Sequence, residues 1–164
     1  MKKAILILSI LFALFAGCTK YPDGPSFTLR TAKSRMVGTW KIEKLLIDNA
    51  DSTDEYVSKV GCEVEFLKDI YNPDGADFKL KLINCNNGKT CEGFWELNSK
   101  NKYIDWIFFK DTTFLTVIGP IGANRDGEWT ILKLTNKELK LFTYSPWSNT
   151  WGNSRRFDLE MKKQ

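Results

Sequence analysis

Apolar and charged residues alternate along most of the chain from Val37 onward. Lys41, for example, separates Trp40 from Ile42, and Glu65 separates Val64 from Phe66. A period of two places successive side chains on opposite faces of a β-strand, so each such segment has one apolar and one polar face. The alternating apolar series are Trp40/Ile42, Val64/Phe66, Phe78/Leu80/Leu82, Trp95/Leu97, Ile104/Trp106/Phe108, Leu139/Leu141 and Phe157/Leu159/Met161.

Turn-forming residues separate these runs, at residues 48–51, 72–75, 86–88, 98–101 and 124–127. Their roughly regular spacing of about 10 to 14 residues is typical of an all-β barrel or sandwich. About eight to ten strands joined by short links predict an antiparallel up-and-down β-barrel, with a β-sandwich as the alternative. The only helical segment we expect is one short turn over residues 32–37, before the first strand.

Two strands depart from the alternation. Ile107 and Phe109 place apolar groups on the face opposite Trp106, and Leu132 follows Ile131 directly. Either a β-bulge shifts the side-chain pattern there, or another segment covers the outer face.

The first 17 residues have the parts of an export signal. Lys2 and Lys3 form a basic end, residues 4–15 are apolar except for Ser9, and small residues precede Cys18. The apolar run is shorter than the roughly 20 residues that span a bilayer. The string at residues 14–18 resembles a bacterial lipobox, which implies cleavage before Cys18 and attachment of diacylglycerol and a palmitate-type acyl chain there. An ordinary secretory signal is the alternative.

The chain therefore divides into a signal peptide at residues 1–17, a lipidated tether at 18–34 and a barrel domain at 35–164. Pro22, Gly24 and Pro25 disfavour regular structure in the tether. Thr19 follows the cysteine where an aspartate would resemble an inner-membrane retention signal, so we expect anchoring to the outer membrane of the cell envelope. Either a periplasmic or a surface-facing location fits.

Gly38-Thr39-Trp40, at the start of the first strand, resembles the Gly-x-Trp signature of lipocalins. The resemblance covers residues 32–162. It implies that Trp40 closes one end of an up-and-down barrel beneath an arginine of the last strand. Arg155 or Arg156 is the candidate, and Arg155 is preferred because it has the parity of Phe157.

Besides Cys18, the chain has Cys62, Cys85 and Cys91. An exported chain meets oxidising conditions, so disulfides are allowed. Cys85 and Cys91 flank a five-residue segment symmetrically, which predicts a bridge across a hairpin neck and leaves Cys62 as a buried thiol. Pairing of Cys62 with Cys85 across neighbouring strands is the alternative.

The amino-acid composition excludes several kinds of catalytic and metal-binding site. The chain has 164 residues and no histidine, which excludes a Ser-His-Asp triad and imidazole metal ligands. Its net charge of +4 includes Lys2 and Lys3, so the mature chain is nearly balanced and we expect no nucleic-acid partner. Asp105 is conspicuous among apolar neighbours but has no second carboxylate that the sequence can assign to it. We expect no enzymatic activity, no cofactor and no metal.

The expected function is binding of a small apolar or amphipathic ligand inside the barrel. The alternative is a filled barrel that binds a glycan or an envelope protein through loop aromatics. The candidate ligand-binding residues are Phe66, Phe78, Trp95, Trp106 and Phe108, together with Trp147 and Trp151 of the last hairpin loop.

Overall fold

The computed structural model describes residues 21–24, 29–70, 78–86, 88–109, 128–145 and 155–164. Most of them belong to strands. In chain order the elements are α2 (Ala32–Met36), β1 (Gly38–Ile47), β2 (Ala50–Asp51), α3 (Thr53–Lys59), β3 (Glu63–Ile70), β4 (Phe78–Ile83), β5 (Cys91–Asn98), the 3₁₀-helix η1 (Ser99–Asn101), β6 (Tyr103–Phe109), β7 (Glu128–Leu134), β8 (Glu138–Ser145) and β9 (Arg155–Lys163).

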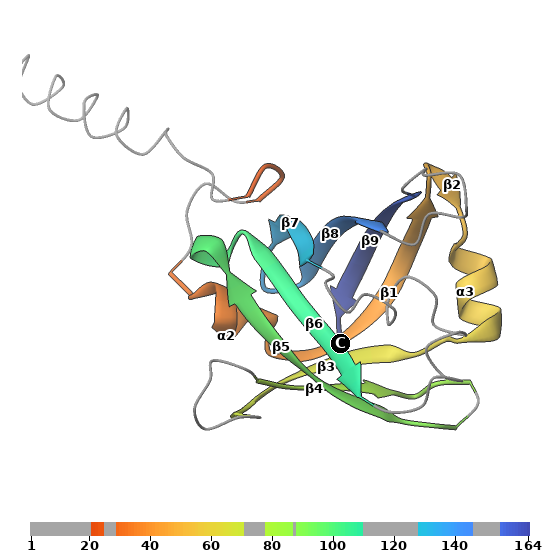
Figure 1. Cartoon of the computed structure of the whole chain (residues 1–164), viewed down its shortest axis with the longest axis horizontal. Coiled ribbons are helices and arrows are strands. Elements are labelled where there is room, and N and C mark those ends of the chain that lie inside the picture. The colour runs from red at the N-terminus through yellow and green to blue at the C-terminus, as the bar shows by residue number, and fades with distance from the viewer. Residues whose placement is uncertain (1–20, 25–28, 71–77, 87, 110–127, 146–154) are drawn as a thin grey trace, which may run out of the picture.

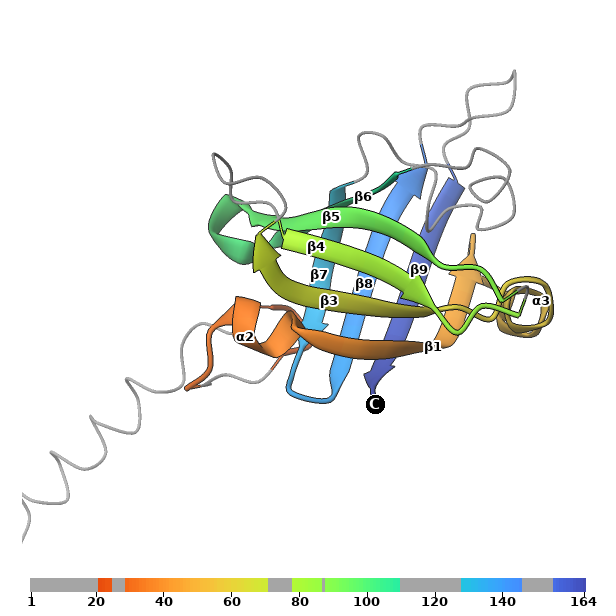
Figure 2. The same cartoon turned by 90° about the horizontal axis from the view of Figure 1, so that it is seen from below.

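The strands form one antiparallel sheet that closes on itself. The order is β1-β3-β4-β5-β6-β7-β8-β9, and β9 pairs back with β1 from Lys163 opposite Trp40 to Phe157 opposite Ile47. The short β2 pairs only with the end of β1. The predicted up-and-down barrel is therefore confirmed, with eight strands in the closed wall, and Figures 1 and 2 show it from two sides.

The barrel has two ends with different elements, which Figure 2 separates clearly. At the α2 end lie α2, η1, the turn between β7 and β8, and the last residue of β9. At the α3 end lie α3, the β1–β2 turn and the connection between β4 and β5. Strand direction decides which residues reach which end, because neighbours are antiparallel throughout.

The core follows the alternation of the sequence. Register pairs inward residues with inward residues, as in Trp40 opposite Val64 and Phe66 opposite Leu80. All four of these side chains have essentially no exposed surface. The irregularity expected after Ile131 is a bulge between Ile131 and Lys133, which returns Leu134 to the buried face.

Of the two α-helices in the described residues, α2 and α3, the sequence predicted α2. The hydroxyl of Thr31 caps α2 by accepting the N–H of Ser34 at 3.2 Å. Helix α3 was not predicted, although Asp54 and Glu55 in its first turn suit a helix N-terminus. Its Tyr56 is buried and donates its hydroxyl proton to the carbonyl of Cys62 at 3.1 Å, which fixes α3 against the start of β3.

The predicted turns adopt the backbone conformations that their residues tolerate. Asp48 and Asn49 both have positive φ, at 51° and 68°, between β1 and β2. Lys100 and Asn101 do the same in η1, at 62° and 61°. Asparagine and aspartate adopt this region more easily than most residues, which is why the sequence signal located these links correctly.

Candidate functional site

Trp40 lies at the α2 end of the barrel and has no exposed surface. Its indole N–H donates to the carbonyl of Met36, the last residue of α2, at 2.6 Å. Met36 is itself fully buried. The helix before the first strand and the indole therefore pack together and fill this end of the barrel.

The cation next to Trp40 is Lys163. Its ammonium group lies 5.1 Å from the centroid of the indole ring and donates to the carbonyl of Arg35 at 2.8 Å. Burial lowers the pKa of Lys163, and the nearby charge of Arg30 lowers it further. A desolvated ammonium over an indole face is a cation–π contact.

The prediction that Arg155 or Arg156 packs over Trp40 is wrong. Arg155 pairs with the carboxylate of Asp48 at 2.9 Å at the α3 end, and Arg156 bonds to Asp158. The reason is strand direction. β9 runs antiparallel to β1, so the end of β9, not its beginning, reaches Trp40. The alternation of the sequence predicted the correct face of β9, but it carries no information about which end of β9 lies next to Trp40.

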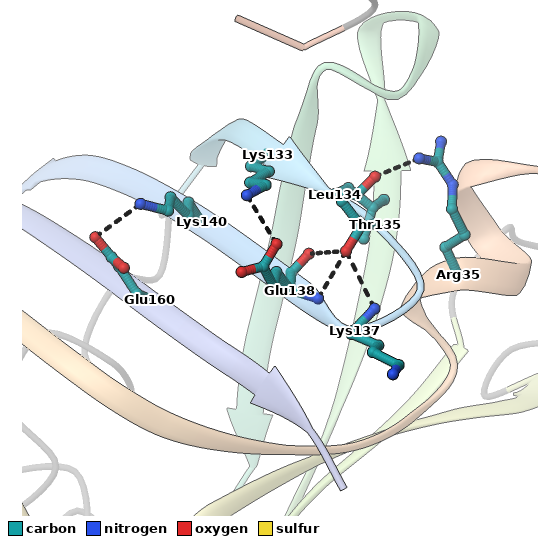
Figure 3. A network of polar contacts seen from close by, with 8 residues as sticks. All are labelled: Arg35, Lys133, Leu134, Thr135, Lys137, Glu138, Lys140 and Glu160. Atoms are coloured by element: carbon teal, nitrogen blue, oxygen red, sulfur yellow. Dashed lines mark hydrogen bonds and ion pairs between the residues drawn. The ribbon is translucent and has the colours of Figure 1, made fainter. Parts of the chain in front are cut away.

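Arg35 is a buried cation beside this cluster, with 3% of its surface exposed. Its Nη1 donates to the carbonyl of Leu134, as Figure 3 shows. Its guanidinium lies 5.6 Å from the ring centroid of Tyr21, which is buried from solvent. Among the described residues no carboxylate pairs with Arg35, so carbonyl and aromatic groups are the contacts that compensate for its burial.

Tyr21 belongs to the segment that was predicted to be a tether, residues 18–34. It is only 1% exposed, and the N–H of Asp23 donates to the carbonyl of Leu132 in β7 at 2.9 Å. Burial raises the pKa of Tyr21, against a smaller opposing effect of Arg35. Residues 21–24 thus pack on the barrel near its α2 end. An isolated tyrosine between Lys20 and Pro22 has no periodic pattern that would have revealed this contact.

The β7–β8 turn at the same end is held largely by the side chain of Thr135 (Figure 3). The hydroxyl of Thr135 accepts the N–H groups of Lys137 at 3.1 Å and Glu138 at 2.8 Å. Lys133 forms an ion pair with Glu138 at 2.7 Å. The turn is therefore ordered while the side chain of Lys137 stays exposed.

Three of the predicted ligand-binding residues come together inside the barrel. The rings of Phe66 and Trp95 meet edge to face with centroids 5.4 Å apart, and Phe78 lies 5.2 Å from Trp95. The indole N–H of Trp95 donates to the carbonyl of Leu67 at 3.2 Å. From outside, the ammonium of Lys33 lies 3.4 Å from the ring centroid of Phe78. Lys33 thus links α2 to this aromatic cluster.

On β3 and β5 the inward residues are smaller toward the α3 end than at the α2 end, whereas β9 has the reverse order, with Met161, Leu159 and then Phe157. On β5 the inward residues are Trp95, Gly93 and Cys91, and all three are buried. On β8 the corresponding series ends at Thr143. From the α2 end toward the α3 end, the inward series are Phe66 and Val64 on β3 with Cys62 just before it; Phe78, Leu80 and Leu82 on β4; Trp95, Gly93 and Cys91 on β5; and Leu139, Leu141 and Thr143 on β8.

The remaining candidates are described only in part or not at all. Trp106 and Phe108 lie on β6, opposite Trp95 and Gly93 in the register, while their side chains are outside the described part of the chain. Trp147 and Trp151 lie outside the described residues altogether.

The predicted disulfide between Cys85 and Cys91 is wrong, because the bridge joins Cys62 to Cys85. Cys91 pairs with Leu82 in the register of β4 and β5, so it is not opposite Cys85. Cys62 directly precedes β3 and Cys85 follows β4, and these two strands are neighbours. Cys91 is a buried thiol.

Asp105 has partners on both sides. It pairs with Glu96 on β5 and Glu128 on β7 in the register, so three carboxylates lie in a row across the outer wall. The amide of Asn98 donates to Asp105 at 2.6 Å and to Glu128 at 3.2 Å. Burial raises the pKa of Asp105, and the charge of Glu128 raises it further. The sequence could not reveal this row, since strand pairing alone assembles it.

In the described part of the chain, no group of three or more Cys, Asp or Glu side chains is placed to hold a metal ion. Within those same residues, no helix combines the length and the apolar character needed to cross a bilayer.

The strand order and the closure of β9 on β1 define the fold class: an all-β, antiparallel up-and-down barrel. Neither a family model nor a curated protein matches this chain. Among solved structures, it is similar to the crystal structure of a lipocalin-like protein from Bacteroides uniformis. The sequence identity is 15%, the match covers 79% of this chain and 99% of that one, and the TM-score is 0.46.

Proposed function

We propose that this protein is an outer-membrane lipoprotein, anchored through acyl chains on Cys18, that binds a small apolar or amphipathic ligand inside its barrel. The two halves of the proposal depend on different observations. The anchor is supported by the order of basic, apolar and small residues before Cys18. The ligand is supported by the identity of the inward side chains of the barrel.

The small inward residues of β3 and β5 toward the α3 end are the observation that carries ligand binding. Bulky rings occupy the α2 half of the interior, where Phe66 contacts Trp95 and Trp40 fills the end. In the other half, Gly93 contributes no side chain to the interior, and Thr143 contributes a small one opposite the larger, buried Phe157 of β9. Eight-stranded barrels hold one small ligand where the inward side chains leave room for it.

The lining predicts the chemistry of the ligand. Val64, Leu82 and Cys91 are apolar, while the hydroxyl of Thr143 already donates to the carbonyl of Glu128 at 2.9 Å. A mostly apolar surface binds an acyl chain, a ring system or another hydrophobic group, with any polar part directed toward the α3 end. No general acid–base pair is needed for such a function.

Two leucine substitutions on β5 test the ligand half. Gly93→Leu places a large side chain in the interior of the barrel. Glu92→Leu places the same side chain on the outer face of β5, at the neighbouring, exposed position. We expect Gly93→Leu to abolish binding of a fluorescent fatty acid and Glu92→Leu to leave it unchanged. Equal binding by both variants would contradict a ligand in the α3 half.

Native mass spectrometry of the protein purified from its own membrane identifies the bound molecule. A protein that carries no ligand and binds no fatty-acid probe would contradict this half of the proposal and would favour the glycan or protein partner considered above. Circular dichroism of the two β5 variants is the control for folding.

Fractionation of cells that produce Cys18→Ala tests the anchor. Cleavage and acylation both act at this cysteine, so we expect the variant to remain unprocessed or to leave the membrane fraction. Membrane partitioning equal to that of the unchanged protein would contradict lipidation at Cys18.

A further inference from the structure

Positive side chains gather at the α2 end of the barrel. They come from segments far apart in the chain that strand pairing brings to one rim. Lys68 lies near the end of β3, Lys100 and Lys102 lie at the β5–β6 link, and Lys137 lies in the β7–β8 turn. The basic rim, as we call it, consists of the exposed residues Arg30, Lys33, Lys68, Lys100, Lys102, Lys137 and Lys162.

Few exposed acids oppose this charge among the described residues of that end. They are Asp23, Asp69 and Glu138, and Glu138 is neutralised by its ion pair with Lys133 at 2.7 Å. Asp74 and Asp77 of the β3–β4 connection lie outside the described residues. The rim is therefore predominantly positive where the structure describes it.

The α3 end has the opposite character. Among its described residues, the exposed acids are Asp48, Asp51, Asp54, Glu55 and Glu92, and residues 110–127 of the β6–β7 connection lie outside the described part of the chain. The exposed cations of that end are Lys59, Lys89 and Arg155, of which Lys59 pairs with Glu55 at 2.6 Å and Arg155 with Asp48 at 2.9 Å. The barrel is thus polarised along its axis, although its net charge is small.

The position of Tyr21 fixes which end faces the anchor. Tyr21 is buried beside Arg35, and Asp23 bonds to Leu132, so the chain is attached to the barrel near its α2 end. Only three peptide units separate Tyr21 from Cys18, and a fully extended chain spans at most about 3.6 Å per residue. An acylated Cys18 would hold this attachment point within about 11 Å of the bilayer surface.

We infer that the basic rim binds the headgroups of anionic phospholipids. This contact orients the barrel with its α2 end against the membrane and its α3 end facing away from it. The inference rests on the lipid anchor proposed above. Because about 11 Å is the upper limit of this distance, the rim can approach the bilayer to within the Debye length of about 8 Å at physiological ionic strength, where its charges are not fully screened. Each lysine near an anionic surface contributes about a fivefold increase in partitioning.

Orientation gives this contact a function. With the rim on the bilayer, the acidic α3 end and the ligand-binding half of the interior face away from the membrane. A ligand would then enter from the aqueous side, not by lateral transfer from the lipid.

The test measures binding to vesicles without any contribution from acyl chains. The mature chain, residues 18–164, carries Cys18→Ala and is mixed with vesicles of phosphatidylethanolamine and phosphatidylglycerol, or with vesicles of phosphatidylcholine alone. The rim variant adds Lys68→Gln, Lys102→Gln and Lys137→Gln. A matched variant removes the same charge at the other end through Lys59→Gln, Lys89→Gln and Arg155→Gln.

We expect the Cys18→Ala chain to sediment with the anionic vesicles and not with the neutral ones, and to be released by high salt. The rim variant should lose at least about tenfold in partition coefficient, and the matched variant less than about threefold. Equal losses in the two variants, salt-independent binding or no preference for anionic vesicles would overturn the inference. Because no acyl chain is present, none of these results depends on whether Cys18 is lipidated in cells.

Discussion

The α2 and α3 ends of the barrel are held together by different forces. At the α2 end, large side chains with no exposed surface pack on one another, with Trp40 between Met36 and Lys163. At the α3 end, a disulfide and ion pairs between half-exposed groups such as Asp48 and Arg155 connect the segments. Buried apolar area stabilises a fold far more than exposed ion pairs do.

This difference explains how a small barrel combines stability with a binding site. A ligand needs interior space, and space costs packing energy. If packing at one end supplies most of the stability, the other end can carry small inward residues and be closed by a covalent cross-link. Equal contributions of the two ends to the free energy of unfolding would contradict this division.

The largest effect is expected at Trp40. Trp40→Ala removes a fully buried indole together with its bond to Met36 and its contact with Lys163. We expect the free energy of unfolding to fall by about 3–5 kcal/mol in urea denaturation. Tyr144→Ala, which truncates a half-exposed ring on β8, is the control and should cost less than about 1 kcal/mol. Similar losses in both variants would remove the distinction between the ends.

The disulfide is expected to matter almost as much. The Cys62–Cys85 bridge closes a sequence separation of 23 residues. Such a loop corresponds to about 3 kcal/mol of stabilisation, which Cys85→Ser should remove. Cys91→Ala should leave the bridge intact and cost less. Non-reducing peptide mapping should recover Cys62 joined to Cys85, and a Cys85–Cys91 peptide would contradict the register of β4 and β5.

A smaller effect, of known sign, is expected at Asp105. Burial and Glu128 raise its pKa, so the folded protein binds this proton more tightly than the unfolded chain does. The contribution of protonated Asp105 to the free energy of unfolding is fully present below the pKa of the unfolded state. It is lost as the pH rises through the pKa of the folded state. Asp105→Asn should therefore stabilise the protein at neutral pH, by less than about 1 kcal/mol because the group is partly exposed. Denaturation at several pH values measures it, and destabilisation by Asp105→Asn at neutral pH would refute it.

The smallest effect is expected at the exposed pair of the α3 end. Hydrogen bonds from Arg155 and from the N–H of Arg156 lower the pKa of Asp48. Its contribution is therefore present above the unfolded pKa and is lost as the pH falls through the folded pKa, opposite to Asp105. Arg155→Gln should weaken this acid dependence and change the melting temperature little at neutral pH. A loss of unfolding free energy comparable to that of Trp40→Ala would show that ion pairs supply most of the stability of the α3 end.

Much of the barrel was predictable because alternation is a local property. The polarity of Lys41 and Glu65 against Trp40 and Phe66 assigns faces to strands without knowledge of their neighbours. Residues that favour positive φ, such as Asn49, mark the links. These signals located the strands, the short turn at α2 and the burial of the inward side chains.

The errors concern how strands meet. Cys85 and Cys91 look symmetrical along the chain, yet register places Cys91 opposite Leu82 and leaves Cys85 near Cys62. Arg155 has the right parity for Trp40, yet the antiparallel closure of β9 on β1 brings Lys163 there instead. The row of Glu96, Asp105 and Glu128 likewise exists only after pairing.

The amino-acid sequence by itself determined which residues are strands, which faces are apolar and where the chain turns, because propensity and periodicity act over a few neighbouring residues. Only the tertiary structure decided the disulfide, the cation on Trp40, the buried place of Tyr21 and the separation of charge between the two ends. Each of these depends on register, strand direction or the closure of the barrel. Such long-range pairings are selected by the packing of the whole core and leave no local trace in the chain.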